Sequence, residues 1–599
     1  MSQLQVQEIN GKFLYYAFVS GGNAILENQY EINEINVFPV RDKDTGTNLA
    51  STVRSVIDNI KPHKSYKKTV NKIAEAALMG ARGNSGVIFA QFLYGLSKET
   101  KSTHAISLNE FAESLKRSIP YVYEAISNPV EGTILTVIKD WSDFIYKNKT
   151  LGKDFKNVLI ESLETAEKSL KETTSKLKAL NKYGVVDAGA KGFVLFVQGI
   201  INFIKQGNIR DLAKSGHQSI SLIHTEDVID EDISFRYCTE AILKNLSIDK
   251  ADLRKKLADR GDSIVVAGSD DMCRIHVHTD KPAELFHDLK NFSTITFQKV
   301  DDMVRQYEVS VKRKWKIAVV TDSTCDLPQE LLDHYQINML PLNLNFGDNH
   351  YLDKITVQPE QFYDLLETEE EFPKTSQINE RAFTNVYSHL ASHYDKIISI
   401  HLTGKFSGTY NSSRKAAERI MSEFDTEIFT FDSRNLSGAL GLMVLKTAQS
   451  IENGETFENI KALLPKWRDE AKIFVSVRDL KYMLKGGRVS GTKGMIAKFL
   501  GLNPVISMAP DGTSMLFGKT FSQQSSLKKI FNHISKISKG KKIWNYVVLH
   551  AHNEEGAAET AQKMEEITGR KPLSLINISP VIGMHAGLGA NAVALLYEN

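Results

Sequence analysis

Two acidic residues, Asp42 and Asp44, stand one residue apart in the segment 36–48, which reads NVFPVRDKDTGTN. Carboxylates this close suit Mg²⁺, which takes its ligands from water, carboxylates and phosphate oxygens. Taken alone, the pair could equally be a solvated acidic turn. The segment 80–86 (GARGNSG) could present backbone N–H groups and a hydroxyl to a phosphate at a helix start, or could be a glycine-rich helix junction.

Two histidines, His276 and His278, alternate in a strand-like segment and therefore face the same side of a strand. With Cys238 as a third, softer ligand they form a donor set that favours zinc. The spacing leaves a second interpretation open, in which the two histidines are hydrogen-bonded near Asp280 and hold no metal.

Small hydroxyl side chains on glycine-containing turns recur in the C-terminal half, together with one cation and one imidazole. The residues are Thr375, Ser376, Ser407, Gly408, Arg488 and His585. Such a set can fix a single carboxylate at the mouth of an apolar cavity. Taken singly, each residue is more often a helix cap or a surface group.

The composition is that of a folded, multidomain protein. The chain has 599 residues, 42% of them hydrophobic, and 74 basic against 72 acidic residues give a net charge of +2. We therefore expect three or four domains and no nucleic-acid partner. Three widely spaced cysteines and an N-terminus without a signal-peptide pattern predict a reducing, cytoplasmic location.

Hydrophobic periodicity divides the chain into three parts. Residues 1–208 carry helical periodicity, shown best by the apolar stripe from Phe155 to Leu177. Residues 209–313 have the pattern of a small α/β or α+β domain with strands at 264–267 and 272–278. Residues 314–599 alternate short apolar runs with helical stretches, which predicts a doubly wound α/β domain. The nearly uncharged stretch 578–597 is expected to be buried strand and loop.

The first two glycine-rich and acidic segments, together with residues 129–136 (PVEGTILT) and 185–192 (VVDAGAKG), resemble the nucleotide-binding domain of dihydroxyacetone-kinase-type proteins, specifically the kinase subunit of bacterial fatty-acid kinase. The resemblance implies an all-α helical barrel that binds ATP and two Mg²⁺ ions. It assigns the ions and catalysis to Asp42 and Asp44. It places Asn36, Thr45, Thr47, Asn48, Asn84, Ser85, Gly86, Thr133 and Asp187 around the ions and the nucleotide. Arg41 and Lys43 depart from the family pattern Pro-Asp-Gly-Asp.

The other two parts also resemble known families. The segments RYCTE and HVHTDKP resemble the middle domain of the same kinase subunit, which implies a metal or ligand site at Cys238 and the two histidines. Residues 314–599 resemble the DegV family of fatty-acid-binding proteins. This resemblance implies that Thr375 and Ser407 bind the carboxylate with support from Arg488 and His585, while the acyl chain lies in the interior. Gln377 and Phe521 depart from the family pattern.

Together the parts predict an ATP-dependent fatty-acid kinase with its own lipid carrier. A carboxylate is already ionised at pH 7, so its attack on ATP needs no general base. Joining both parts in one chain raises the effective concentration of the carrier. Two alternatives stay open: a non-catalytic lipid-binding protein that senses nucleotide, and a carbohydrate or hydroxyketone kinase with a regulatory C-terminal domain. We expect a homodimer, a separate DegV-type carrier and an acyltransferase as partners, with room for peripheral membrane contact.

Overall fold

The computed structural model describes residues 8–38, 44–126, 129–149, 154–206, 233–488 and 502–598. The chain forms two compact units. The first contains the N-terminal helices and most of a middle β-sheet. The second contains the C-terminal α/β part, beginning at Val304, with the short segment Pro282–Lys290.

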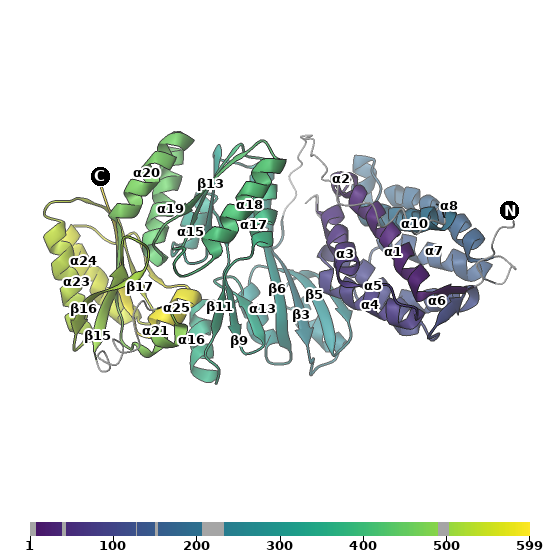
Figure 1. Cartoon of the computed structure of the whole chain (residues 1–599), viewed down its shortest axis with the longest axis horizontal. Coiled ribbons are helices and arrows are strands. Elements are labelled where there is room, and N and C mark those ends of the chain that lie inside the picture. Colours follow the sequence, from purple (N-terminus) through teal and green to yellow (C-terminus); the bar gives the residue numbers. More distant parts are fainter. Residues whose placement is uncertain are drawn as a thin grey trace. The chain divides into compact units, whose positions relative to one another are not determined.

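A bundle of helices makes up the N-terminal domain (Figure 1). The helices are α1 (Gly11–Glu27), α2 (Gln29–Glu34), α3 (Thr45–Asn59), α4 (Tyr66–Gly80), α5 (Gly83–Glu99), α6 (Leu108–Glu124), α7 (Ile134–Asn148), α8 (Phe155–Lys176), α9 (Lys178–Tyr183) and α10 (Ala188–Gln206). One small antiparallel pair, β1 (Glu8–Asn10) with β2 (Ala105–Ser107), accompanies them. The predicted helical first third is confirmed, including the long amphipathic helix α8.

Helix α10 packs against α1, α7 and α8. Its aromatic residues meet others edge to face, as Phe193 does with Trp141 and Phe92. Among the described helices, α10 is the one long and apolar enough to cross a membrane by length and composition. Because 61% of that apolar window is buried, α10 is accounted for as a core helix of the bundle.

The middle domain is a four-stranded antiparallel sheet with the strand order β4-β5-β3-β6. The strands are β3 (Tyr237–Lys244), β4 (Asp262–Gly268), β5 (Met272–Thr279) and β6 (Thr294–Asp302), and α12 (Lys250–Ala258) follows β3. Both strands expected from the sequence are confirmed as β4 and β5. Residues 207–232, around the expected boundary at 208, lie outside the described residues.

The C-terminal part contains a parallel sheet with the order β13-β12-β7-β8. Its strands are β7 (Ile317–Asp322), β8 (Asn338–Leu340), β12 (Lys396–His401) and β13 (Glu427–Asp432). A small antiparallel sheet, β10-β9-β11, consists of β9 (Asn343–Phe346), β10 (Asn349–Leu352) and β11 (Lys374–Ser376). The helices here are α13 (Pro282–Leu289), α14 (Met303–Val311), α15 (Gln329–His334), α16 (Pro359–Thr368), α17 (Glu380–Ala391) and α18 (Thr409–Glu423).

A second, six-stranded sheet has the order β16-β15-β14-β19-β17-β18 and is mainly antiparallel. Its strands are β14 (Ala471–Ser476), β15 (Asn503–Met508), β16 (Ser514–Thr520), β17 (Ile543–His550), β18 (Leu575–Asn577) and β19 (Asn591–Tyr597). The helices are α19 (Ser437–Glu452), α20 (Phe457–Glu470), α21 (Lys481–Gly486), α23 (Gln523–Ile537), α24 (Glu554–Thr568) and α25 (Pro580–Ala586).

The α/β class is confirmed, but the arrangement differs from the single doubly wound sheet expected from the sequence. The apolar runs do form strands, yet β14 pairs antiparallel with β19, about 120 positions later. A short apolar run predicts burial and does not specify its partner strand, so three sheets replace one. The stretch 578–597 likewise contains the helix α25 before the buried strand β19.

Candidate functional site

Four long helices of the N-terminal domain begin close together: α3, α5, α7 and α10. The side chain of Asn48, on α3, lies against Gly83, the first residue of α5. A Cβ added at Gly189, on the first turn of α10, would lie 2.8 Å from Ser85 Oγ and 3.3 Å from Ile134 Cβ, which belong to the starts of α5 and α7. Helix starts carry N–H groups and partial positive charge that suit a phosphate. At α7 and α10, Asp187 and Thr133 already accept some of these N–H groups.

Two glycines permit close packing around the starts of α3 and α5. Gly83 has φ +55°, and an added Cβ would lie 2.2 Å from Asn48 Nδ2. A Cβ at Gly46 would lie 2.1 Å from the carbonyl oxygen of Gln29 on α2. A side chain at Gly83 would push α5 away from α3, and one at Gly46 would push α3 away from α2. The segment GARGNSG is therefore both the junction between α4 and α5 and the start of α5.

The residues predicted to bind the nucleotide differ in their burial and in their hydrogen-bond partners. Asn84 Oδ1 is buried and has no hydrogen-bond partner among the described residues, which leaves it available to a ligand. Thr47 instead accepts bonds from Gln29 and Asn33 on α2. Asp42 lies outside the described residues. The remaining predicted residues in this region are placed as follows: Asn36, Thr45 and Asn48 are buried, Asp44 precedes α3, and Ser85 and Gly86 lie on the first turn of α5.

Asp187 joins the starts of α7 and α10. Its Oδ1 accepts the N–H of Ile134 at 3.0 Å and that of Ala190 at 2.8 Å. Burial raises the pKa of Asp187 to about 6, although these two hydrogen bonds act in the opposite direction. Thr133, also predicted for the nucleotide pocket, is the N-cap of α7. Both residues therefore order the helix starts, and a direct contact to nucleotide stays a prediction.

The three candidate metal ligands of the middle domain come together. Cys238 pairs with His278 in the β3–β5 register, and Cys238 Sγ lies 3.8 Å from His276 Nδ1. One ligand atom from each of the three residues lies within 4.8 Å of the others. Zinc bonds of about 2.0–2.3 Å in a tetrahedron separate ligand atoms by roughly 3.4–3.8 Å, so the cluster fits one zinc ion after small adjustments.

Carboxylates lie beside both rings of this cluster: His276 Nδ1 is 3.6 Å from Glu240 Oε1, and His278 Nδ1 is 3.5 Å from Asp262 Oδ1. Burial, followed by the charges of Glu240 and Asp301, raises the pKa of the Cys238 thiol. Burial, reinforced by the neighbouring His276, lowers the pKa of His278 to about 3, so its imidazole is neutral. His276 Nε2 is buried without a partner among the described residues. Asp280 bonds the N–H of Arg236. The carboxylates beside the histidines are thus Glu240 and Asp262 in place of Asp280, and both interpretations, a metal site and hydrogen-bonded histidines, stay predictions.

A cavity of about 190 Å³ lies in the C-terminal part, and most of its wall is apolar. Residues of both sheets line it, among them Leu402 after β12, Val475 on β14 and Ile506 on β15. All six residues predicted for substrate binding line the same cavity: Thr375, Ser376, Ser407, Gly408, Arg488 and His585. Gln377, one of the departures from the family pattern, lines it too.

Polar groups also line this cavity. Thr375 lies on β11, and Ser407 lies on the loop after β12, where its Oγ is 2.8 Å from Thr409 Oγ1. Burial, followed by the positive charge of Arg488, lowers the pKa of His585 to about 4, so its ring is neutral. His585 Nδ1 has no partner among the described residues. The cavity lining thus includes two hydroxyls, an imidazole and a guanidinium, all of which can donate hydrogen bonds to an anion.

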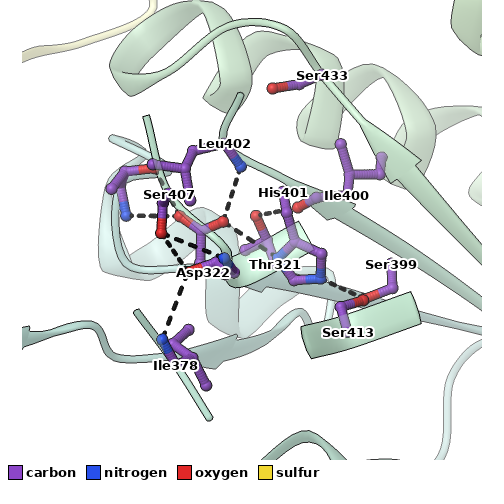
Figure 2. Close-up of polar contacts among 12 residues, drawn as sticks. Thr321, Asp322, Ile378, Ser399, Ile400, His401, Leu402, Ser407, Ser413 and Ser433 are labelled. Atoms are coloured by element: carbon purple, nitrogen blue, oxygen red, sulfur yellow. Dashed lines mark hydrogen bonds and ion pairs between the residues drawn. The ribbon is translucent and has the colours of Figure 1, made fainter. Parts of the chain in front are cut away.

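A buried network holds the loop that carries Ser407 (Figure 2). Asp322 Oδ2 accepts the N–H of Leu402 at 2.9 Å and lies 3.1 Å from His401 Nδ1. His401 Nε2 in turn lies 2.7 Å from Ser399 Oγ. The distances are those of a hydrolase triad, but all three side chains are fully buried, so no substrate reaches them. The network fixes the end of β12, from which the loop departs.

A second buried network holds α25, which carries His585. Asp326 Oδ1 accepts the N–H of Ser579 at 3.1 Å and pairs with Lys354 Nζ at 2.7 Å. Asp353 Oδ1 accepts the N–H of Val581 at 3.2 Å. The polar loop after β7 therefore stabilises α25 through a hydrogen bond to its backbone. The sequence indicated a polar loop here, but it did not indicate which residues the loop would bond.

These folds and sites define a multidomain protein that joins a kinase-like helical domain to an α/β ligand-binding domain. Family models match three parts of the chain: the DAK2 domain at residues 39–202, the FakA-like middle domain of fatty acid kinases at 234–310, and the DegV family of uncharacterised proteins at 316–598. The chain thus matches, in this order, a DAK2 domain, a FakA-like middle domain and the DegV family, as its motifs predict.

Curated relatives share part of this organisation. An uncharacterised protein of Staphylococcus saprophyticus is 32% identical over 327 residues, and one of Staphylococcus epidermidis is 30% identical over 327 residues. Each match covers 52% of this chain and 58% of the relative, so the chain spans little more than half the length of these relatives.

Solved DegV-family structures resemble the C-terminal part in sequence. A fatty-acid-binding DegV family protein from Thermus thermophilus is 27% identical, and DegV, a fatty-acid-binding protein from Bacillus subtilis, is 29% identical. Both have a TM-score of 0.44, and they cover 47% and 48% of this chain and all of their own chains.

Proposed function

We propose that this protein is an ATP-dependent fatty-acid kinase that phosphorylates the carboxylate of a fatty acid held in its own C-terminal cavity. The single observation that supports this most is the pairing, in one chain, of four converging helix starts with an apolar cavity rich in headgroup donors. The first arrangement suits the phosphates of a nucleotide, and the second suits a long-chain carboxylic acid.

The reaction needs positioning more than acid–base chemistry. An oxygen of the ionised carboxylate attacks the γ-phosphorus of ATP, the bond from that phosphorus to the bridging oxygen breaks, and ADP leaves with the electron pair. No proton is removed, because a carboxylic acid with a pKa near 4 is already ionised at pH 7. The products are an acyl phosphate and ADP.

The chain's own residues would orient the nucleotide. Backbone N–H groups at the starts of α3 and α5 bind phosphate oxygens, and Asn84 Oδ1 offers an acceptor beside them. Mg²⁺, when bound, neutralises charge on the phosphates, and Asp44 with Asp42 would hold it. Asp44 is the N-cap residue of α3, which places its carboxylate at the start of that helix.

On the acyl side, Thr375 and Ser407 donate hydroxyl hydrogen bonds to the carboxylate, while Arg488 and the neutral His585 surround the headgroup. The hydrocarbon chain lies against the apolar wall. Gly486 lets His585 approach, because a Cβ there would lie 2.0 Å from His585 Nδ1. Removing water from this wall favours binding by about 25 cal/mol for each Å² of buried apolar surface.

We also propose that Cys238, His276 and His278 hold one zinc ion with a structural role, which the neutral His278 and the unpartnered His276 Nε2 support. A homodimer, a separate DegV-type carrier, a downstream acyltransferase, peripheral membrane contact and a cytoplasmic location remain proposals that rest on sequence resemblance and composition.

The test is acyl-phosphate formation by the purified full chain with ATP, Mg²⁺ and oleate, trapped as the hydroxamate. We expect product from the wild type, and at least a hundredfold less from Asp44→Asn. Replacing Thr384, on the exposed face of α17, serves as a control that leaves the rate unchanged. Nucleotide and oleate binding without any product would overturn the proposal and favour a nucleotide-sensing lipid-binding protein.

A further inference from the structure

Glu240, on β3 of the middle-domain sheet, lies against the start of α5 in the helical domain. The backbone N–H of Gly83 donates to Glu240 Oε1 at 2.5 Å. The other carboxylate oxygen, Oε2, accepts from Arg274 Nη2 at 2.6 Å. Glu240 and Arg274 are only 1% and 2% exposed. Because a buried ion pair fixes its members in one geometry, the carboxylate has little freedom to leave Gly83.

Arg274 also contacts the helix that precedes this start. Its Nη1 donates to the carbonyl oxygens of Leu78 at 3.3 Å and Met79 at 3.1 Å, in the last turn of α4. An anion therefore lies at the first N–H of α5 and a cation at the last carbonyls of α4, and each charge matches the dipole of its helix end. The ion pair holds both sides of the connection from Gly80 to Gly83.

Further hydrogen bonds join the sheet to the helical domain, and they fix the position of the sheet, and so of Glu240, relative to α5. Gly268 N–H, at the end of β4, donates to Gln91 Oε1 on α5 at 2.8 Å. Val266 N–H donates to the carbonyl oxygen of Ala125 at 2.8 Å. Together these bonds tie β4 to α5 and to the end of α6. The middle-domain sheet therefore contacts α5 at two residues, Gly83 and Gln91.

Glu240 accepts the N–H of Gly83 and leaves the next two N–H groups of α5 available to a ligand. Within the described part of the chain, Gly86 N–H bonds the carbonyl of Arg82, and no acceptor is seen for the N–H groups of Asn84 and Ser85. These two groups lie in the first turn of α5, where a phosphate would bind. Because the Glu240 carboxylate leaves these two N–H groups uncovered, it can stabilise the start of α5 without blocking the phosphate site.

We propose that Glu240 and Arg274 are positioning residues that hold the phosphate-binding start of α5, so that the middle-domain sheet is part of the nucleotide site. This inference rests on the proposed kinase function only in taking a nucleotide as the ligand. Neither residue touches substrate. Each acts through the backbone between α4 and α5, and losing either one lets Gly83 and the two open N–H groups shift.

The experiment compares Mg·ADP binding by the full chain in the wild type, Glu240→Gln and Arg274→Gln, using isothermal titration calorimetry. The amide of Glu240→Gln can face either Gly83 or Arg274 correctly, but not both. The matched control is Asp302→Asn, which breaks the ion pair of Asp302 with Arg236 (2.7 Å) in the same sheet.

We expect both test variants to raise the Kd for Mg·ADP at least tenfold with an unchanged stoichiometry, and Asp302→Asn to match the wild type. Oleate affinity should stay within twofold of the wild type in all variants. A merely structural role would lower the stoichiometry through loss of folded protein and leave the Kd of the remainder unchanged. That result, or a Kd within twofold of the wild type, would overturn the proposal.

The outcome is separable from the proposed function. A wild type that binds Mg·ADP but forms no acyl phosphate would reject the kinase activity, while the Kd values of the variants would still decide the role of Glu240 and Arg274. A wild type that binds no nucleotide would reject both proposals.

Discussion

Replacing Gly83 by alanine tests the geometry of the helix starts most directly. Gly83 has φ +55°, a conformation that costs an L-residue about 1–2 kcal/mol. The new Cβ would also lie 2.2 Å from Asn48 Nδ2, so Asn48 must move. If Asn48 bonds a charged phosphate, losing that bond costs about 1.5–3 kcal/mol, which corresponds to roughly a 10- to 100-fold weaker nucleotide affinity.

The matched control is Gly184→Ala. Gly184, which follows α9, has a similar φ of +65°, but no atom lies within 4 Å of the position that its Cβ would take. Both variants carry the backbone strain, and only Gly83→Ala adds a displaced side chain. The strain alone should lower the melting temperature of this unit by about 2–8 °C in both variants.

The assay pairs thermal unfolding with calorimetric titration of Mg·ADP. We expect Gly184→Ala to keep the wild-type Kd and Gly83→Ala to raise it at least tenfold. If Gly83→Ala binds Mg·ADP like Gly184→Ala, Asn48 and the start of α5 do not contact the phosphates, and our interpretation of the four helix starts is wrong.

Three further perturbations test the buried carboxyl group, the headgroup site and the zinc site. The folded-state pKa of Asp187, about 6, is raised above its ordinary 3.8, so the native state retains a proton that the unfolded chain loses between about pH 4 and 6. The contribution of Asp187 to stability should therefore fall by roughly 3 kcal/mol as pH rises through that window. Asp187→Asn keeps the acceptor oxygen and should be at least as stable as the wild type at pH 7 in chemical unfolding, so a loss above 1 kcal/mol contradicts this. Ser407→Ala should weaken oleate binding about 5- to 10-fold in a fluorescence displacement assay, with Thr384→Ala as the unaffected control. Equal affinity in the two would remove Ser407 from the headgroup site. Cys238→Ser should lower the zinc content, measured by elemental mass spectrometry, from about one ion per chain to nearly none, whereas Cys273→Ala on β5 retains it. Zinc-free wild-type protein would refute the site.

Much of the fold follows from local pattern. The apolar stripe from Phe155 predicts α8 because residues three and four apart share one face of a helix. The alternation of His276 and His278 likewise places both on one face of β5, and the structure brings Cys238 beside them on β3. The grouping of Thr375 with His585 required the resemblance to a known family, since 210 positions separate them in the chain.

The partners of the strands could not be predicted in this way. Apolar runs such as 473–477 and 546–549 identify buried strands, but they fit a parallel or an antiparallel neighbour equally well. The six-stranded sheet arises because β19 returns at the end of the chain and pairs with β14 and β17 on either side. That pairing is decided by long-range packing, which no local window of sequence contains.

The sequence by itself determined the order of the helical, middle and α/β parts, the motif residues and the apolar character of the interior, because these depend on residue types and short spacings. Only the tertiary structure decided that Glu240 meets Gly83 across 157 positions and that the carboxyl group of Asp187 is buried enough to raise its pKa. Distances between remote residues and the desolvation of a charge are properties of the packed chain, and they exist only after it has folded.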